Sequence, residues 1–182
     1  MKQIKIDITY HRKRYRIHLG NGQTLFFDTK TKAEKYRRKY KRIIKDNVYM
    51  LNLIQPNVNQ LFRQSYFQMD VRDIRHIKQL FHNFDERFDY IFKTFSSGNQ
   101  NAFVFQNIDT CFFYLSEITK QLHLFGQTHK NYGLTVQTRP LLKQLQYLEE
   151  TFNNDKRAIR LNDSYTIVKP LRPSKNEQQN TN

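Results

Sequence analysis

Lysine and arginine are concentrated at the amino-terminal end of this chain. Residues 1–50 hold fifteen Lys or Arg and four Asp or Glu, which is +11 of the net +15 carried by the 182 residues. Lys and Arg neutralise phosphates, and a guanidinium can also donate two hydrogen bonds to a guanine edge. A cationic end with interleaved tyrosines on a nearly balanced chain therefore indicates contact with nucleic acid. A solvated face that only keeps the protein soluble is the alternative interpretation.

The other reactive side chains form no catalytic or metal-binding pattern. His76 and His82 are six residues apart, as are His123 and His129, whereas two imidazoles on one helical face need a spacing of about three or four. Cys111 is the single cysteine, and its sequence neighbours include no His or cation to activate it. The sequence has no nucleophile motif and no phosphate-binding glycine loop. We therefore expect a protein that is not an enzyme and needs no cofactor or metal.

The basic residues require elements that display them, and the alternation of apolar and polar residues predicts three strands. It extends over residues 3–10 and 14–19, which is the period of half-buried strands. The polar residues 11–13 separate these two segments, and Asn21-Gly22 is a strong hairpin signal before a third strand over residues 23–27. In this sheet the outward side chains of the second strand are basic.

The remaining sequence predicts helices. Thr31 and Glu34 form a capping box that opens a basic amphipathic helix. Helical periodicity then continues to about residue 160, with breaks expected near Pro56 and at residues 96–99. We predict an α+β protein with three parts: a basic head of three strands and a helix (1–46), a four-helix bundle (47–160) and a disordered tail (161–182).

A short motif joins the third predicted strand to the first helix. It reads TLFFDTKTKAEKY over residues 24–36, and it follows two predicted strands and the Asn-Gly turn. This succession resembles the N-terminal arm-type DNA-binding domain of phage and mobile-element tyrosine integrases, over about residues 1–46. In that family a three-stranded sheet enters the major groove and the helix packs behind it. By position, the resemblance implies groove contacts by Arg14, Arg16, His18 and Thr24.

The chain after Asn47 departs from that family. It shows no set of arginines, histidines and a tyrosine nucleophile that would form the integrase catalytic domain. The resemblance thus implies DNA binding in a mobile-element setting, and not recombination.

We predict a DNA-binding accessory protein of a phage or mobile element that holds duplex DNA through the basic head. Arg14 and Arg16 are expected to read bases, and the cations of the helix to hold the backbone. Two alternatives stay open: a virion or assembly protein whose basic end meets the genome or an acidic partner, and RNA binding with Tyr15 or Phe26 stacked on bases. The predicted nucleic-acid-binding residues are Arg12, Lys13, Arg14, Arg16, His18, Thr24, Lys35, Arg38, Lys39 and Arg42.

Composition also bears on partners and location. No window is apolar over the ~18–20 residues needed to cross a bilayer, so we expect no membrane contact. The start of the chain lacks the apolar core of a secretory signal, and one lone cysteine suits a reducing compartment. We expect a cytoplasmic or virion location. The phenylalanine-rich segment 101–122 leaves a homo-oligomer open, because apolar side chains left outside the bundle must be covered.

Overall fold

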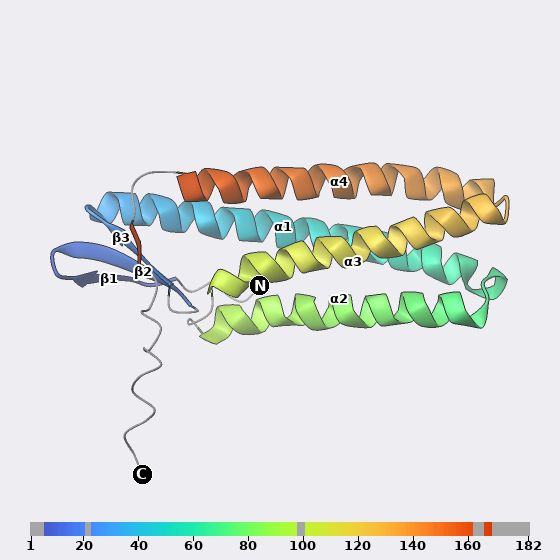
Figure 1. The fold of residues 1–182 in the computed structure, drawn as a ribbon, viewed down its shortest axis with the longest axis horizontal. Coiled ribbons are helices and arrows are strands. Elements are labelled where there is room, and N and C mark those ends of the chain that lie inside the picture. The colour runs from blue at the N-terminus through green and yellow to red at the C-terminus, as the bar shows by residue number, and fades with distance from the viewer. Residues whose placement is uncertain (1–5, 21–22, 98–100, 162–165, 169–182) are drawn as a thin grey trace, which may run out of the picture.

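Helical periodicity from residue 30 onward produces four long helices, and the alternating segments before it form a small sheet at one end of the bundle (Figure 1). The computed structural model describes residues 6–20, 23–97, 101–161 and 166–168. The α+β class predicted from the sequence, with a sheet that precedes a helical bundle, is confirmed. In chain order the elements are β1 (Ile8–His11), β2 (Arg14–Gly20), β3 (Gln23–Phe27), α1 (Lys30–Ser65), η1 (Tyr66–Gln68), α2 (Val71–Ser97), α3 (Asn101–Thr128), α4 (Tyr132–Leu161) and β4 (Thr166–Val168).

Helix α3 is central in the bundle and packs against α1, α2 and α4. Its sequence explains this position, because apolar residues occupy nearly all of its sides. The ring of Phe105 lies 4.6 Å from that of Tyr40 in α1 and 5.4 Å from that of Phe152 in α4. Several phenylalanines of α3 are thus covered by helices of the same chain. Phe113 is an exception, with 56% of its surface exposed. Self-association through this helix stays a prediction. The fully buried residues of α3 include Ile108, Cys111, Phe112, Leu115, Ile118 and Leu122.

Helix α1 is one continuous helix of 36 residues, which corrects two expectations. It is capped by Thr29 rather than Thr31, since the Thr29 hydroxyl accepts a hydrogen bond from the backbone N–H of Lys32 at 3.3 Å. It also runs through Pro56 without a break. Pro56 is exposed, so water can reach the Asn52 carbonyl that loses its helical donor. Because α1 also spans residues 46 and 47, the predicted boundary between head and bundle lies inside one helix.

The sheet packs one face against the bundle. Ile17, Leu25 and Phe27 are at most 1% exposed, and β2 and β3 contact α1 while β2 also contacts α3. The ring of Phe27 lies 5.4 Å from that of Tyr36 in α1. The three predicted strands are thus confirmed, but β1 begins only at Ile8, and Tyr10 on the inner side of the register is 64% exposed next to the β1–β2 turn. The Asn21-Gly22 turn lies outside the described residues.

A fourth strand completes the sheet, and the sequence reading missed it. β4 pairs antiparallel with β3, so the strand order is β1-β2-β3-β4. The prediction that residues 161–182 are disordered is therefore wrong for Thr166–Val168, which form β4, and for Leu161, which is the last residue of α4. The rest of the segment lies outside the described residues. The physical reason is that β3 would otherwise present unpaired backbone groups at a sheet edge. Three consecutive β-branched residues were the available signal.

Candidate nucleic-acid interface

The sheet has an outer face that points away from the bundle. Paired residues on antiparallel strands share a face, and the register pairs Ile17 with Leu25 on the buried side and Arg16 with Phe26 on the other. The four predicted groove-contacting side chains all belong to this outer face. Strands β1, β2 and β3 contain no Asp or Glu. We define the outer sheet face as Thr9, His11, Arg14, Arg16, His18, Thr24 and Phe26.

A cross-strand hydrogen bond holds Arg16 in place. Its Nε donates to the hydroxyl of Thr9 at 2.7 Å, and Arg16 is half-buried. Arg14 lies opposite His11 near the end of the ribbon and is exposed. A guanidinium with fewer accessible rotamers loses less entropy when it binds, so Thr9 pre-orients Arg16. Sequence reasoning missed Thr9, although counting back from the two-residue turn pairs residue 9 with residue 16.

His18 adds a polar but uncharged group to this face at neutral pH. Its Nδ1 lies 2.9 Å from the hydroxyl of Thr24, directly across the strand pair. Burial, and secondarily the positive charge of Arg16, lower the pKa of His18 below its usual value. His18 therefore adds little positive charge beside Arg14 and Arg16 at neutral pH.

The turn between β1 and β2 carries two further cations. Arg12 and Lys13 have φ angles of 47° and 61° and are both exposed. Positive φ at both central residues defines a type I′ turn, in which Asn-Gly is the favoured pair. A side chain in this region costs about 1 kcal/mol per residue. Figure 1 shows this turn projecting past the first turn of α1, so Arg12 and Lys13 lie at the extreme end of the molecule.

The predicted cations of α1 do not join the outer sheet face. Lys35, Arg38 and Arg42 are exposed, whereas Lys39 is half-buried on the flank of the helix. The buried side of α1 faces the inner side of the sheet and the bundle, so the exposed cations point away from both. Arg38 also lies 4.0 Å from Glu34 in an exposed ion pair. The predicted set of ten residues thus divides between two separate surfaces.

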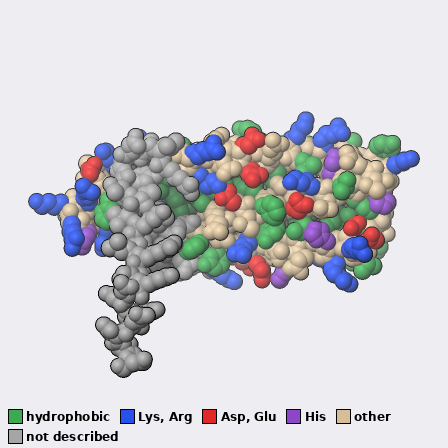
Figure 2. All heavy atoms as spheres, in the orientation of Figure 1, with side chains coloured by type: hydrophobic (Ala, Val, Ile, Leu, Met, Phe, Trp, Pro, Cys, Tyr) green, Lys and Arg blue, Asp and Glu red, His purple; other side chains and the backbone are tan. Residues whose placement is uncertain are grey.

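Charge is distributed unevenly over the whole molecule. Figure 2 shows Lys and Arg gathered at the end formed by the sheet and the start of α1, whereas acidic and basic side chains are interspersed along the bundle. This agrees with the sequence, in which residues 51–182 hold sixteen Lys or Arg and twelve Asp or Glu. The excess positive charge of the molecule therefore lies at the sheet end.

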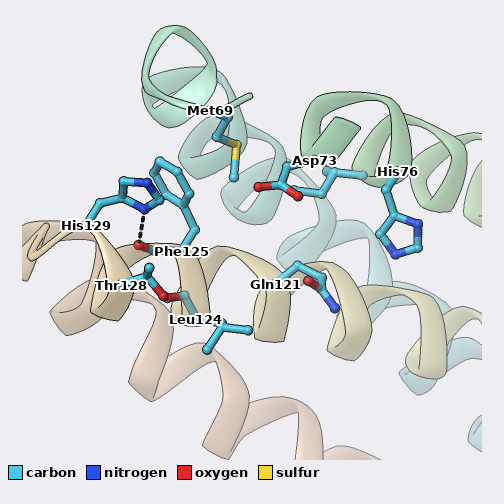
Figure 3. Close-up of a pocket in the computed structure, with 9 residues that line it drawn as sticks. Met69, Asp73, His76, Gln121, Leu124, Phe125, Thr128 and His129 are labelled. Carbon is cyan, nitrogen blue, oxygen red and sulfur yellow. Dashed lines mark hydrogen bonds between the residues drawn. The ribbon is translucent and has the colours of Figure 1, made fainter. Parts of the chain in front are cut away.

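A pocket at the other end of the bundle is lined by two histidines that are distant in the sequence, His76 and His129. It has a volume of about 150 Å³ between α2 and α3, and its lining includes Asp73, His76 and His129. Figure 3 shows the two histidines at opposite ends of this pocket, and His129 Nδ1 lies 3.1 Å from the carbonyl of Phe125. Among the described residues no group of three His, Cys, Asp or Glu is placed to hold a metal ion.

Cys111 is buried in the bundle, and its thiol is kept protonated. Burial raises the pKa of Cys111 to about 12, with opposing smaller effects from Arg87 and Asp85. A protonated thiol is a poor nucleophile. This residue acts as a small apolar side chain in the core.

Within the described ranges, none of the helices combines the length and apolarity required to cross a bilayer. No protein-family model, no curated protein sequence and no solved structure matches this chain. The likeness of residues 1–46 to an integrase arm-type domain therefore stays a prediction from the sequence.

Proposed function

We propose that this chain is a non-enzymatic DNA-binding protein that docks its outer sheet face on duplex DNA. One observation carries the proposal: the solvent-facing side of β1–β3 holds Arg14 and Arg16, adjoins Arg12 and Lys13, and belongs to strands without Asp or Glu. The major groove is about 12 Å wide and admits a two-stranded β-ribbon such as the β1–β2 hairpin, which carries Arg14 and Arg16. The resemblance to a mobile-element arm domain supports a phage or mobile-element setting, within a host cell or a virion.

The side chains of this face have different roles in the proposal. Arg16, held by Thr9, is suited to a bidentate contact with guanine, with Arg14 as its neighbour along β2. Arg12 and Lys13 project from the end of the ribbon, where they meet phosphates and set the position of the sheet. Phe26 lies opposite Arg16 and supplies an apolar contact suited to a thymine methyl group.

The test is the affinity of the full chain for duplex DNA over a salt series. The variant Arg14→Gln/Arg16→Gln should bind at least about tenfold more weakly, because one arginine contact to DNA contributes about 1–3 kcal/mol. Arg72→Gln/Arg75→Gln is the matched control, since it removes the same charge from exposed positions at the start of α2. Equal loss in both variants would mean that only total charge matters, and the proposal would fail.

RNA or single-strand binding is the closest alternative, and Phe26 favours it. Phe26 lies on the outer sheet face, whereas Tyr15 packs against the core and its ring lies 4.9 Å from that of Tyr10 in a tilted arrangement. Of the two aromatics expected to stack on bases, only Phe26 belongs to that face, because the register pairs it with Arg16 and pairs Tyr15 with the buried Phe27. A Phe26→Leu variant that loses affinity for single strands but not for duplex would establish base stacking as the main interaction.

An assembly role is the second alternative, and the opposite end of the bundle favours it. Phe67, Val71, Tyr132 and Val136 are between 70% and 93% exposed there. The two turns at this end are joined by a hydrogen bond of 3.1 Å from the amide of Asn131 to that of Gln68. Exposed apolar side chains in this number are typical of protein contacts. Equally weak binding of duplex, single strand and RNA would support this role over DNA recognition.

A further inference from the structure

We propose that the outward face of α1 binds the backbone of a second duplex, so that one molecule bridges two DNA segments. This α1 basic face consists of Lys35, Arg38, Arg42 and Lys45, all exposed. The inference rests on the proposed function, because the outer sheet face supplies the first DNA contact.

The geometry of α1 sets this face opposite the sheet. An α-helix turns by about 100° per residue, so these four cations project within about 60° of the direction opposite the buried side. Ala33, Tyr40 and Ile44 define that buried side and are at most 3% exposed. The contact between Tyr36 and Phe27 places the sheet on the buried side as well. A rigid duplex on the outer sheet face therefore cannot reach the α1 basic face.

The two faces are also separated electrostatically. A helix with its side chains is about 10–12 Å across, and the sheet adds a further layer. Charges on opposite sides are then more than one Debye length apart, which is about 8 Å at physiological ionic strength. The cations of α1 therefore contribute little to a duplex on the sheet, and they remain available for another polyanion.

The form of the α1 basic face suits a DNA backbone. From Lys35 to Lys45 the helix rises by about 15 Å, a length over which duplex DNA displays roughly nine phosphate charges. Residues 30–46 hold nine Lys or Arg against two Asp or Glu, and one acid, Glu34, lies 4.0 Å from Arg38. Tyr49 is 60% exposed farther along the same side and can donate a hydrogen bond to a phosphate. An extended row of cations matches an extended row of phosphates.

The experiment is capture of a second duplex. A biotinylated duplex is immobilised, the full chain is added at one molecule per duplex, and retention of a second, fluorescent duplex is measured. Wild type should retain it. Arg38→Gln/Arg42→Gln should reduce retention at least tenfold and change affinity for the first duplex less than twofold. The matched control Arg139→Gln/Lys143→Gln removes two exposed cations at the same spacing from α4 and should retain the second duplex.

Several results would overturn the inference. The first is that wild type does not retain the second duplex, although its binding of a single duplex depends on Arg14 and Arg16. That result would overturn the bridging inference and leave the proposed function intact. Another is equal loss in both double variants, or displacement of the second duplex by polyglutamate as readily as by unlabelled DNA. A third is that the second duplex is retained only under conditions where sedimentation shows a dimer, and that this retention depends on Arg14 and Arg16. The two duplexes would then be held by the outer sheet faces of two molecules. If instead Arg14→Gln/Arg16→Gln leaves single-duplex affinity intact, the proposed function fails by itself.

Discussion

Replacing Thr9 by Val tests whether the sheet pre-orients Arg16 for DNA. Valine has nearly the shape of threonine and favours strands, so the free energy of unfolding should fall by only about 0.5–1.5 kcal/mol, the usual net contribution of one hydrogen bond. The substitution removes the 2.7 Å hydrogen bond to the Arg16 Nε. It leaves the charge of the face unchanged.

The expected effect on affinity follows from the freedom that Arg16 gains when that bond is lost. Ordering one long side chain at an interface costs about 0.5–1.5 kcal/mol. Without Thr9, binding must supply this ordering, and we expect a loss of about 1 kcal/mol, or roughly fivefold in affinity for duplex DNA. Arg16→Gln removes the guanidinium itself and should cost about 1–3 kcal/mol.

Fluorescence anisotropy with a labelled duplex at several salt concentrations measures both effects. Thr9→Val should weaken binding with the same salt dependence as wild type, because the number of cations is unchanged. Circular dichroism checks that the fold is kept. If Thr9→Val binds as wild type while Arg16→Gln is impaired, pre-orientation by Thr9 is refuted. If both bind as wild type, Arg16 does not contact DNA.

Three further predictions follow from the same structure. Burial and Arg16 lower the pKa of His18 in the free protein, whereas DNA phosphates should favour its protonation. Duplex affinity should therefore rise as pH falls from about 7.5 to 5.5, by at most about tenfold per pH unit. His18→Gln should flatten this dependence in anisotropy titrations. Arg12→Asn/Lys13→Gly should raise the free energy of unfolding in urea by about 1–2 kcal/mol, because both residues have positive φ. The same variant should bind duplex DNA more weakly, and the slope of log affinity against log salt concentration should fall by up to about two. An unchanged slope would mean that these cations do not contact the DNA. Leu25→Ala should cost about 2–5 kcal/mol of stability for the whole chain. Residues 1–46 alone should show no cooperative melting by circular dichroism, since they lack α3, which contacts β2; a fragment that melts cooperatively would contradict this.

Local patterns in the sequence were enough to predict the sheet and its two faces. Alternation assigns Ile17 and Leu25 to the core and Arg16 and His18 to the outer face, because a strand has a side-chain period of two. The polar turn after β1 follows from the same pattern. These features depend on neighbours within a few residues, so they can be read from the chain alone.

The continuity of α1 and the pairing of β4 depend on contacts between residues that are distant in the sequence. A proline in a helical pattern usually ends the helix, but burial of Ile54 and Val58 on either side of Pro56, at 1% and 0% exposure, holds α1 together. β4 forms because β3 offers an open edge to a segment about 140 residues later in the chain. The three β-branched residues of β4 favour a strand, but nothing local says that a distant strand edge is there to pair with them.

The sequence by itself determined that the chain has a basic end, which strands display its arginines, and which helix carries the remaining cations. Tertiary structure alone decided that the outer sheet face and the α1 basic face point in opposite directions. The physical reason is that charge and periodicity are properties of single segments. The direction in which a surface points depends on how those segments pack against one another.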